Sequence, residues 1–269
     1  RWERMTSSLI KVGMVTTAIL LGSGVTHNAQ AETNQPDQYE VKVYADSHKI
    51  VRDNRHIKHS VLEDLGSEDK DEDFQVQYLD DANRTNYQNN VSYRIRKSED
   101  DSKHKLQYKK RYAISNHDVS SSIQQAKADG YNGDGYEVEY GEGKETLSVT
   151  KEAKEKLGSG SLAMPNAQDS LKILKTHAEQ PYSDALDKIK QPHLIGPVHF
   201  ERHKGNIDGN EVKIENWDIK DQNVVEISSK VTNEAEAKKV QSAIIKRLDQ
   251  LGIHEKKDQL KTNLIFENY

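Results

Sequence analysis

Charged side chains recur two residues apart along several short segments of this chain. In a β-strand, residues i and i+2 lie on the same face, so each pair would place two charges on one face and apolar or aromatic residues on the other. One such strand is usually half exposed to water. Several of them, with both signs of charge, indicate charged faces that meet inside a closed sheet. The residues concerned are Glu40 and Lys42, Arg94 and Arg96, Lys109, Glu137 and Glu139, and Arg202 and Lys204.

An interior of this kind would suit a polyanion and a metal ion together. Arginine binds phosphate oxygens through two parallel hydrogen bonds, and lysine acts as a compact point charge. Carboxylates repel a polyanion unless a hard cation such as Mg²⁺ or Mn²⁺ lies between them. The alternative is that each charged face is merely solvated, as on any half-exposed antiparallel strand.

The elements that would carry these residues can be read from periodicity. Apolar and polar residues alternate over 38–43, 74–79, 91–97, 105–112, 135–140, 197–204, 211–214 (or onward to 219) and 223–231, which predicts strands. Helices are predicted over 55–65, 150–157, 167–190 with a break at Pro181, and 234–251, where Asn233 begins the helix and Gly252 ends it. The segment 258–269 is compatible with a short helix or strand. Strands therefore fall into two groups of about four with helices between and after them, which is an α+β arrangement.

The N-terminal segment 1–31 has the order of a secretory signal peptide, with residues 1–4 as an upstream remnant. The n-region typical of a signal peptide ends at Lys11, an apolar run covers 12–25, and Ala29-Gln30-Ala31 is a cleavage signature. The apolar run is shorter than the roughly 20 residues that span a bilayer, which favours cleavage over a retained anchor. We therefore expect one exported domain over 32–269, secreted or held in the cell envelope, with no stable membrane span.

The amino-acid composition excludes further classes of structure and function. The chain contains no cysteine, which excludes a disulfide framework and thiol catalysis. Its formal net charge is −5, and 1–31 are basic, so the remainder is more acidic still. This balance argues against a nucleic-acid partner. Hydrophobic residues make up only 33% and charged residues 31%, and with so many regular strand patterns this favours a polar interior over disorder.

The order of the charged strands resembles that of the CYTH superfamily, also called triphosphate tunnel metalloenzymes. The resemblance covers nearly all of 38–252, and the order of seven short motifs carries it, since none is specific alone. The family opens on Glu-x-Glu-x-Lys and ends on Glu-hydrophobic-Glu before a helix. The matching positions are Gln38-x-Glu40-x-Lys42, Tyr93-Arg94-Ile95-Arg96, Lys109, Glu137-Val138-Glu139, Arg202 and Lys204, then Glu215 or Asp218, and Glu226-Ile227-Ser228.

The resemblance implies a closed antiparallel eight-stranded β-barrel with flanking helices, in which a triphosphate lies along a tunnel. It implies that Glu40 and Lys42 act in catalysis. It also implies phosphate binding by Lys42, Arg94, Arg96, Lys109, Arg202 and Lys204, and binding of Mg²⁺ or Mn²⁺ by Glu40, Glu137, Glu139 and Glu226. Gln38 and Ser228 depart from the pattern, because the family has Glu at both positions and an amide or hydroxyl is a weaker ligand for a hard cation.

The function expected from the resemblance is that of an exported, metal-dependent phosphohydrolase acting on inorganic triphosphate or a triphosphate-bearing compound. Gln38 and Ser228 favour an alternative, a non-catalytic polyphosphate-binding module on the same fold. A nucleotidyl cyclase is a second alternative, which export makes less attractive because ATP is scarce outside the cell. A third alternative is a cell-surface interaction protein whose charged strand faces are simply exposed to solvent. The sequence does not distinguish the substrate, the metal or the oligomeric state.

Overall fold

The structure is a computed structural model, and it describes residues 34–68, 70–133, 135–158 and 160–269. The predicted signal peptide at 1–31 lies outside the described residues. Among the described helices, none combines the length and the apolar character that a membrane span requires.

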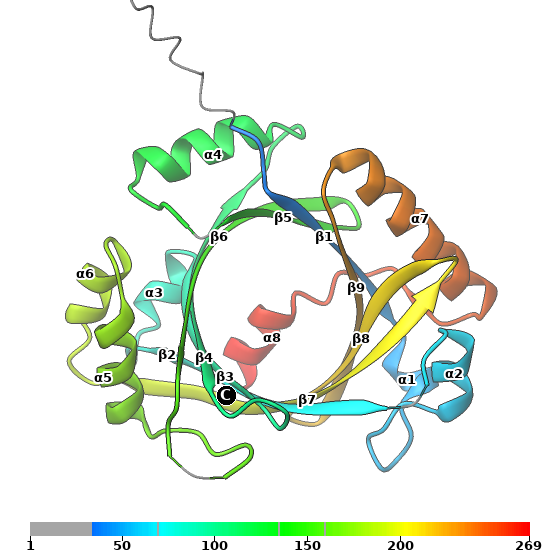
Figure 1. Cartoon of the computed structure of the whole chain (residues 1–269), viewed down its shortest axis with the longest axis horizontal. Helices are drawn as coiled ribbons and strands as arrows, with labels where there is room; N and C mark the ends of the chain where they lie inside the picture. The colour runs from blue at the N-terminus through cyan, green and yellow to red at the C-terminus, as the bar shows by residue number, and fades with distance from the viewer. Residues whose placement is uncertain (1–33, 69, 134, 159) are drawn as a thin grey trace, which may run out of the picture. The chain divides into compact units, whose positions relative to one another are not determined.

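A ten-stranded sheet forms the body of the described chain, and all its strands except the short β10 close into a barrel (Figure 1). The order around the barrel is β1-β5-β6-β4-β3-β2-β7-β8-β9, and β9 pairs with β1 to close it. The strands are β1 (Gln38–Ala45), β2 (Asp71–Asp80), β3 (Val91–Ser98), β4 (His104–Ala113), β5 (Gly135–Gly141), β6 (Lys144–Glu155), β7 (His193–Ile207), β8 (Asn210–Ile219), β9 (Gln222–Val231) and β10 (His254–Glu255).

The predicted closed barrel is confirmed, but its strand number and direction differ from the expectation. The described barrel has nine strands rather than eight. It is also mixed, because β1 and β5 run parallel with Glu40 opposite Glu139, whereas its other pairings are antiparallel. A parallel pair needs a long connection, and here β2, β3 and β4 lie between the two strands in the chain. Nothing in the alternation of either strand marks its direction.

The helix predicted over 150–157 is wrong, because 150–155 belong to β6 and the strand ends at Glu155. β6 pairs with β4 from His104↔Glu155 to Ala113↔Thr146, and with β5 on its other side. Its Lys, Glu and Ala residues favour a helix by intrinsic propensity. Over 150–155 the ladder with β4 pairs these residues instead, and this tertiary pairing overrides a preference of less than about 1 kcal/mol per residue.

Helices surround the barrel, except that α8 is seen through its ring in Figure 1. The predicted break at Pro181 is confirmed, since it separates α5 from α6. Asn233 caps α7 by accepting a hydrogen bond from the Glu236 N–H, and Gly252 follows the helix at φ 67°. The helix predicted over 55–65 is shorter, and the helices α1, α3 and α4 were not predicted. The helices are α1 (Ser47–Ile50), α2 (His59–Asp64), α3 (Thr85–Gln88), α4 (Val119–Ala128), α5 (Ala167–His177), α6 (Tyr182–Asp187), α7 (Glu234–Gln250) and α8 (Lys261–Asn268).

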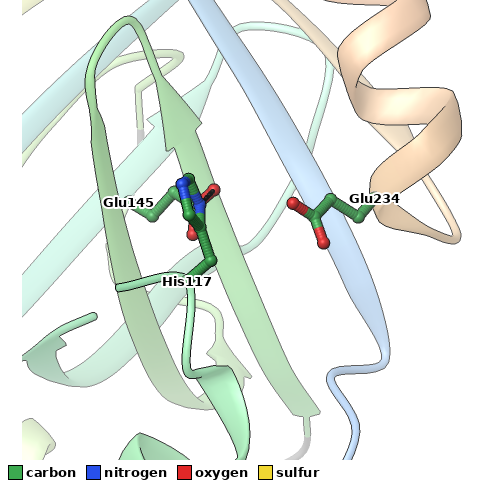
Figure 2. A group of neighbouring side chains, drawn as sticks. All are labelled: His117, Glu145 and Glu234. Atoms are coloured by element: carbon green, nitrogen blue, oxygen red, sulfur yellow. Dashed lines mark hydrogen bonds and ion pairs between the residues drawn. The ribbon is translucent and has the colours of Figure 1, made fainter. Parts of the chain in front are cut away.

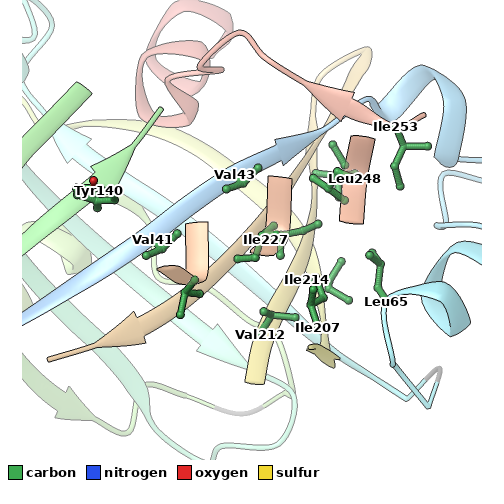
Figure 3. Packing of buried hydrophobic residues seen from close by; sticks show 14 of the residues in the cluster. Val41, Val43, Leu65, Tyr140, Ile207, Val212, Ile214, Ile227, Leu248 and Ile253 are labelled. Atoms are coloured by element: carbon green, nitrogen blue, oxygen red, sulfur yellow. The ribbon is translucent and has the colours of Figure 1, made fainter. Parts of the chain in front are cut away.

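The apolar faces of β1, β3, β4, β6 and β9 point outward, where helices cover them, whereas Phe200 of β7 and Trp217 of β8 face the interior near α8. Val41 and Val43 of β1 and Ile227 of β9 belong to one buried cluster with Leu248 of α7 (Figure 3). In the same way α5 and α6 cover β3 and β4, and α4 covers β6. Burial of apolar surface is the main favourable term in folding. Since most of this apolar burial takes place outside the barrel wall, the inward faces of the strands can carry charged side chains.

Candidate functional site

The barrel encloses a cavity of about 1020 Å³. Every residue predicted for the site lines it, although these residues come from strands that are far apart in the sequence. Of the two candidates for the late acidic residue, Glu215 lines the cavity, whereas Asp218 binds Arg55 and His199 elsewhere. The predicted residues gathered here are Glu40, Lys42, Arg94, Arg96, Lys109, Glu137, Glu139, Arg202, Lys204 and Glu226.

Several charged residues of the cavity were missed from the sequence. Lys230 lies two residues after Ser228 on β9, and Arg111 lies two residues after Lys109 on β4, so the i+2 rule could have found both. Lys261 begins a helix, and no strand pattern could have indicated it. The charged lining residues that were not predicted include Lys105, Arg111, Glu152, Lys213, Lys230 and Lys261.

Glu139 is the centre of the densest ion cluster in the cavity. Its carboxylate lies 3.5 Å from Lys42 Nζ, 3.6 Å from Lys109 Nζ and 3.1 Å from Arg111 Nε. Burial acts to raise the pKa of Glu139, but its three cations outweigh burial and hold the pKa well below the usual value. Lys109 responds differently, because burial and then the Arg111 charge outweigh Glu139 and lower the pKa of Lys109 to about 8.

Glu40 and Glu137 form a second group, in which the two carboxyl groups are hydrogen-bonded to each other. Burial and then the charge of Glu40 raise the pKa of Glu137. Burial also acts on Glu40, but Lys42 and the hydrogen bond with Glu137 lower its pKa. Lys230 Nζ lies 3.1 Å from Glu137 and 3.9 Å from Glu40, and the Gln38 amide donates to Glu137. Of the two carboxyl groups, Glu40 is therefore the more readily ionised, because the pKa of Glu40 is lowered and that of Glu137 is raised.

A third region is rich in arginine. Arg94 donates to the Gln107 side chain over 2.6 Å, and Arg202 lies 2.7 Å from Glu215. The Arg96 guanidinium lies 5.0 Å from the centre of the Phe74 ring, and the described part of the chain offers it no hydrogen bond or ion pair. Burial, followed by the charges of Arg94 and Arg202, lowers the pKa of Arg96 to about 10. Arg96 thus has no carboxylate in direct contact among the described residues, although Glu215 and Glu152 act on its charge from further away.

Glu226 is held apart from the other predicted metal ligands. Lys261 Nζ lies 3.3 Å from its carboxylate, and the Tyr44 hydroxyl donates to it over 3.2 Å. Burial and then the Glu226 charge raise the pKa of Tyr44. Glu226 is therefore already paired with a cation and a hydroxyl from its own chain.

The predicted metal ligands consequently do not form one site. No three of Glu40, Glu137, Glu139 and Glu226 lie within 4.8 Å of one another, and the described residues contain a group this compact elsewhere. Glu139 is held by three cations of the chain, and Glu226 by Lys261 and the Tyr44 hydroxyl, so a metal ion would have to displace partners that are largely buried. Glu40 and Glu137 do fit a metal ion, because Mg²⁺ commonly takes one or two carboxylates and completes its shell with water and phosphate oxygens.

The compact group elsewhere is His117, Glu145 and Glu234, and none of them lines the cavity. His117 Nδ1 lies 2.9 Å from Glu145, and the Glu234 carboxylate faces them from the start of α7 (Figure 2). A carboxylate in the first turn of a helix is stabilised by the helix dipole, and Lys238 lies 3.6 Å from Glu234. These partners account for the group without a metal ion.

Comparison with known proteins gives a distant likeness in structure only. No protein-family model matches the sequence, and no curated protein matches it. A putative adenylyl cyclase from Hippeastrum that has a dominant triphosphatase activity shares 13% identity, with 85% of this chain and 94% of that chain covered and a TM-score of 0.49. Putative adenylate cyclases from Bacillus halodurans and Vibrio parahaemolyticus give 13% and 9% identity, 85% coverage of this chain, 96% and 98% of theirs, and TM-scores of 0.45 and 0.44. The account of the site therefore rests on the residues of this chain.

The cluster around Glu139 predicts a pH-dependent contribution to stability. Glu139→Gln should lower the free energy of unfolding near neutral pH by about 3–5 kcal/mol, because removal of one partner leaves buried charges uncompensated. The folded-state pKa of Glu139 lies below its ordinary value of 4.5, so this contribution is present above pH 4.5 and is lost as the pH falls below it. Urea unfolding of both proteins over this range should show the difference shrinking in acid.

Glu179→Gln is the matched control, because the Glu179 side chain is 68% exposed and pairs with Lys151 at the surface. Its effect should stay below about 1 kcal/mol. A Glu139→Gln difference that does not change with pH would contradict the assignment.

Proposed function

We propose that this chain binds inorganic triphosphate, or the triphosphate of a larger compound, inside its barrel and hydrolyses it with Mg²⁺ or Mn²⁺. The observation that carries the proposal is the convergence of cations from separate strands on one cavity, with Arg96 making no hydrogen bond or ion pair among the described residues. Desolvated charge without a partner is costly, and a polyphosphate supplies the missing negative charge. This is the chemistry that the resemblance to triphosphate tunnel metalloenzymes implies.

The proposed phosphate-binding residues differ in the side chains that they contact in this structure. Arg96 is free to take a phosphate oxygen directly, and Arg94 would exchange its neutral Gln107 partner for one. Arg202 is already paired with Glu215 and would bind through its remaining N–H groups. Fixed cations of this kind do most of the work in phosphoryl transfer, which depends on positioning and on charge stabilisation. Lys42, Lys109 and Lys204 complete the proposed set.

Glu40 and Glu137 are the residues proposed to hold the metal ion. When bound, the ion would neutralise phosphate charge and lower the pKa of a water molecule. Glu40 favours the ionised form and can accept a hydrogen bond from the attacking water. Lys42, 3.8 Å from Glu40 and 3.5 Å from Glu139, is held between the carboxylates by both and is fixed in place for the phosphate.

A binding module without catalysis is the second candidate, and specific observations favour it. Gln38 and Ser228 stand where the family has Glu, and Glu139 and Glu226 are paired with cations of the chain. Fewer carboxylates remain for a metal ion than the family pattern implies. In this alternative the cavity would still hold a polyphosphate.

Export belongs to the proposal as well, and it rests on the order of residues in 1–31. Protein recovered from the envelope or medium of a producing cell should begin at Glu32, directly after Ala31. N-terminal sequencing checks this, and an exported protein that still begins at Met5 would contradict cleavage.

Binding is tested most simply at Arg96. Arg96→Ala should weaken tripolyphosphate binding by about 1.5–3 kcal/mol, the usual scale for a hydrogen bond to a charged group. Lys238→Ala, which removes a cation 64% exposed on α7, should leave binding unchanged. Titration calorimetry measures both. Equal losses from the two variants would point to non-specific attraction and away from a built site.

Catalysis is tested at the proposed metal pair. Glu40→Gln should abolish phosphate release from tripolyphosphate while leaving its binding largely intact, because the cationic wall is unchanged. Gln38→Glu should lower the Mg²⁺ or Mn²⁺ concentration needed for turnover, since a carboxylate replaces an amide beside Glu137. Phosphate release over tripolyphosphate, ATP and thiamine triphosphate is the measurement. If neither the unchanged chain nor Gln38→Glu turns over any of them at any metal concentration, the binding module replaces the enzyme.

A further inference from the structure

The start of α8 places a lysine inside the barrel. Ile265 and Phe266 anchor the helix in a buried cluster that includes Tyr78 and Trp217. This packing directs Lys261 into the cavity, where its side chain is only 12% exposed. Lys261 thus reaches the interior from the C-terminal segment, whereas the phosphate-binding residues proposed above come from the strands.

The surroundings of the Lys261 ammonium are those of a cation site. Its Nζ lies 3.3 Å from Glu226 Oε2, 3.9 Å from Glu215 Oε1 and 4.0 Å from the centre of the Trp217 ring. Glu215 and Glu226 are directly opposite each other on β8 and β9, and their side chains are 8% and 3% exposed. Two buried carboxylates at this spacing repel each other unless a positive charge lies between them.

We infer that Lys261 takes the place of a divalent metal ion at Glu215 and Glu226, so that the barrel uses a fixed ammonium where two carboxylates would otherwise collect a second Mg²⁺ or Mn²⁺. Paired carboxylate oxygens are the donors that such ions prefer. Because α8 tethers the ammonium beside them, it competes at a high effective concentration. The inference rests on the proposed function, and it limits the metal requirement of that function to the pair Glu40 and Glu137.

This arrangement gives the two carboxylate pairs of the cavity different roles. Glu40 and Glu137 have Lys230 at their edge, and because the Lys230 side chain is 48% exposed, a metal ion can displace its ammonium. Glu215 and Glu226 are buried, and Arg202 as well as Lys261 lies against Glu215. The first pair is open to a metal ion and the second is closed to it.

The test counts bound Mn²⁺ ions by electron paramagnetic resonance, with Mn²⁺ alone and no phosphate. Lys261→Met should bind one ion more than the unchanged chain, with an affinity about tenfold above any second site of that chain. Adding Glu226→Gln to Lys261→Met should remove the gained ion. Lys261→Arg keeps the charge and should keep the original count. Lys154→Met is the matched control, since it frees Asp101 from an exposed surface pair and should gain nothing.

The inference is overturned if folded Lys261→Met binds no additional ion, or if the gained ion survives Glu226→Gln. Should Lys261→Met fail to fold, Glu226→Gln in the unchanged background decides, because it should leave the Mn²⁺ count as it was. Loss of an ion there would mean that Glu226 binds metal in the native protein. Tripolyphosphate titration of the unchanged chain separates this result from the proposed function, which fails if no tripolyphosphate binds, whatever the Mn²⁺ counts show.

Discussion

Charge compensation inside the closed wall is the constraint on which the rest of the structure depends. An ion taken out of water costs several kcal/mol unless partners of opposite charge replace the water. The carboxylates of the cavity meet this condition through cations of the chain, and Glu139 with its three neighbours is the clearest case. The apolar faces of the same strands are buried outside the wall under α4, α5, α6 and α7. The barrel is therefore stabilised mainly by apolar packing against its outer face, while charged side chains line its interior.

Charge compensation differs between the carboxylates and the arginines of the cavity. Carboxylates at Glu139, Glu215 and Glu226 are paired with cations of the chain, whereas the guanidinium of Arg96 lies over the Phe74 ring and forms no ion pair among the described residues. An anion entering the cavity would meet Arg94 and Arg96, which form no ion pair among the described residues, together with the carboxyl pair Glu40 and Glu137. A polyphosphate with one bridging metal ion satisfies both, which a purely structural network of ion pairs would not require.

Much of this site could be predicted from the sequence because strand periodicity is local. The spacing of Glu40 and Lys42, or of Arg94 and Arg96, fixes which residues share a face, and closure of the sheet brings those faces together. The sequence could not predict which side chain each charged residue contacts or which strands pair with each other. Whether Glu226 meets a metal ion or Lys261 depends on where α8 packs, and the parallel pairing of β1 with β5 is a tertiary property. The strand β6 was missed for the same reason, since its residues favour a helix until two neighbouring strands pair with it.

The central claim is that the cavity is a preformed polyphosphate site, and thermal unfolding with tripolyphosphate tests it most directly. A ligand that binds only the folded state stabilises it by RT ln(1 + [L]/Kd), about 2.7 kcal/mol at a concentration of 100 Kd. The account predicts that Tm rises steadily with the logarithm of tripolyphosphate concentration and exceeds the effect of sodium chloride at the same ionic strength. Two titrations that coincide would contradict it.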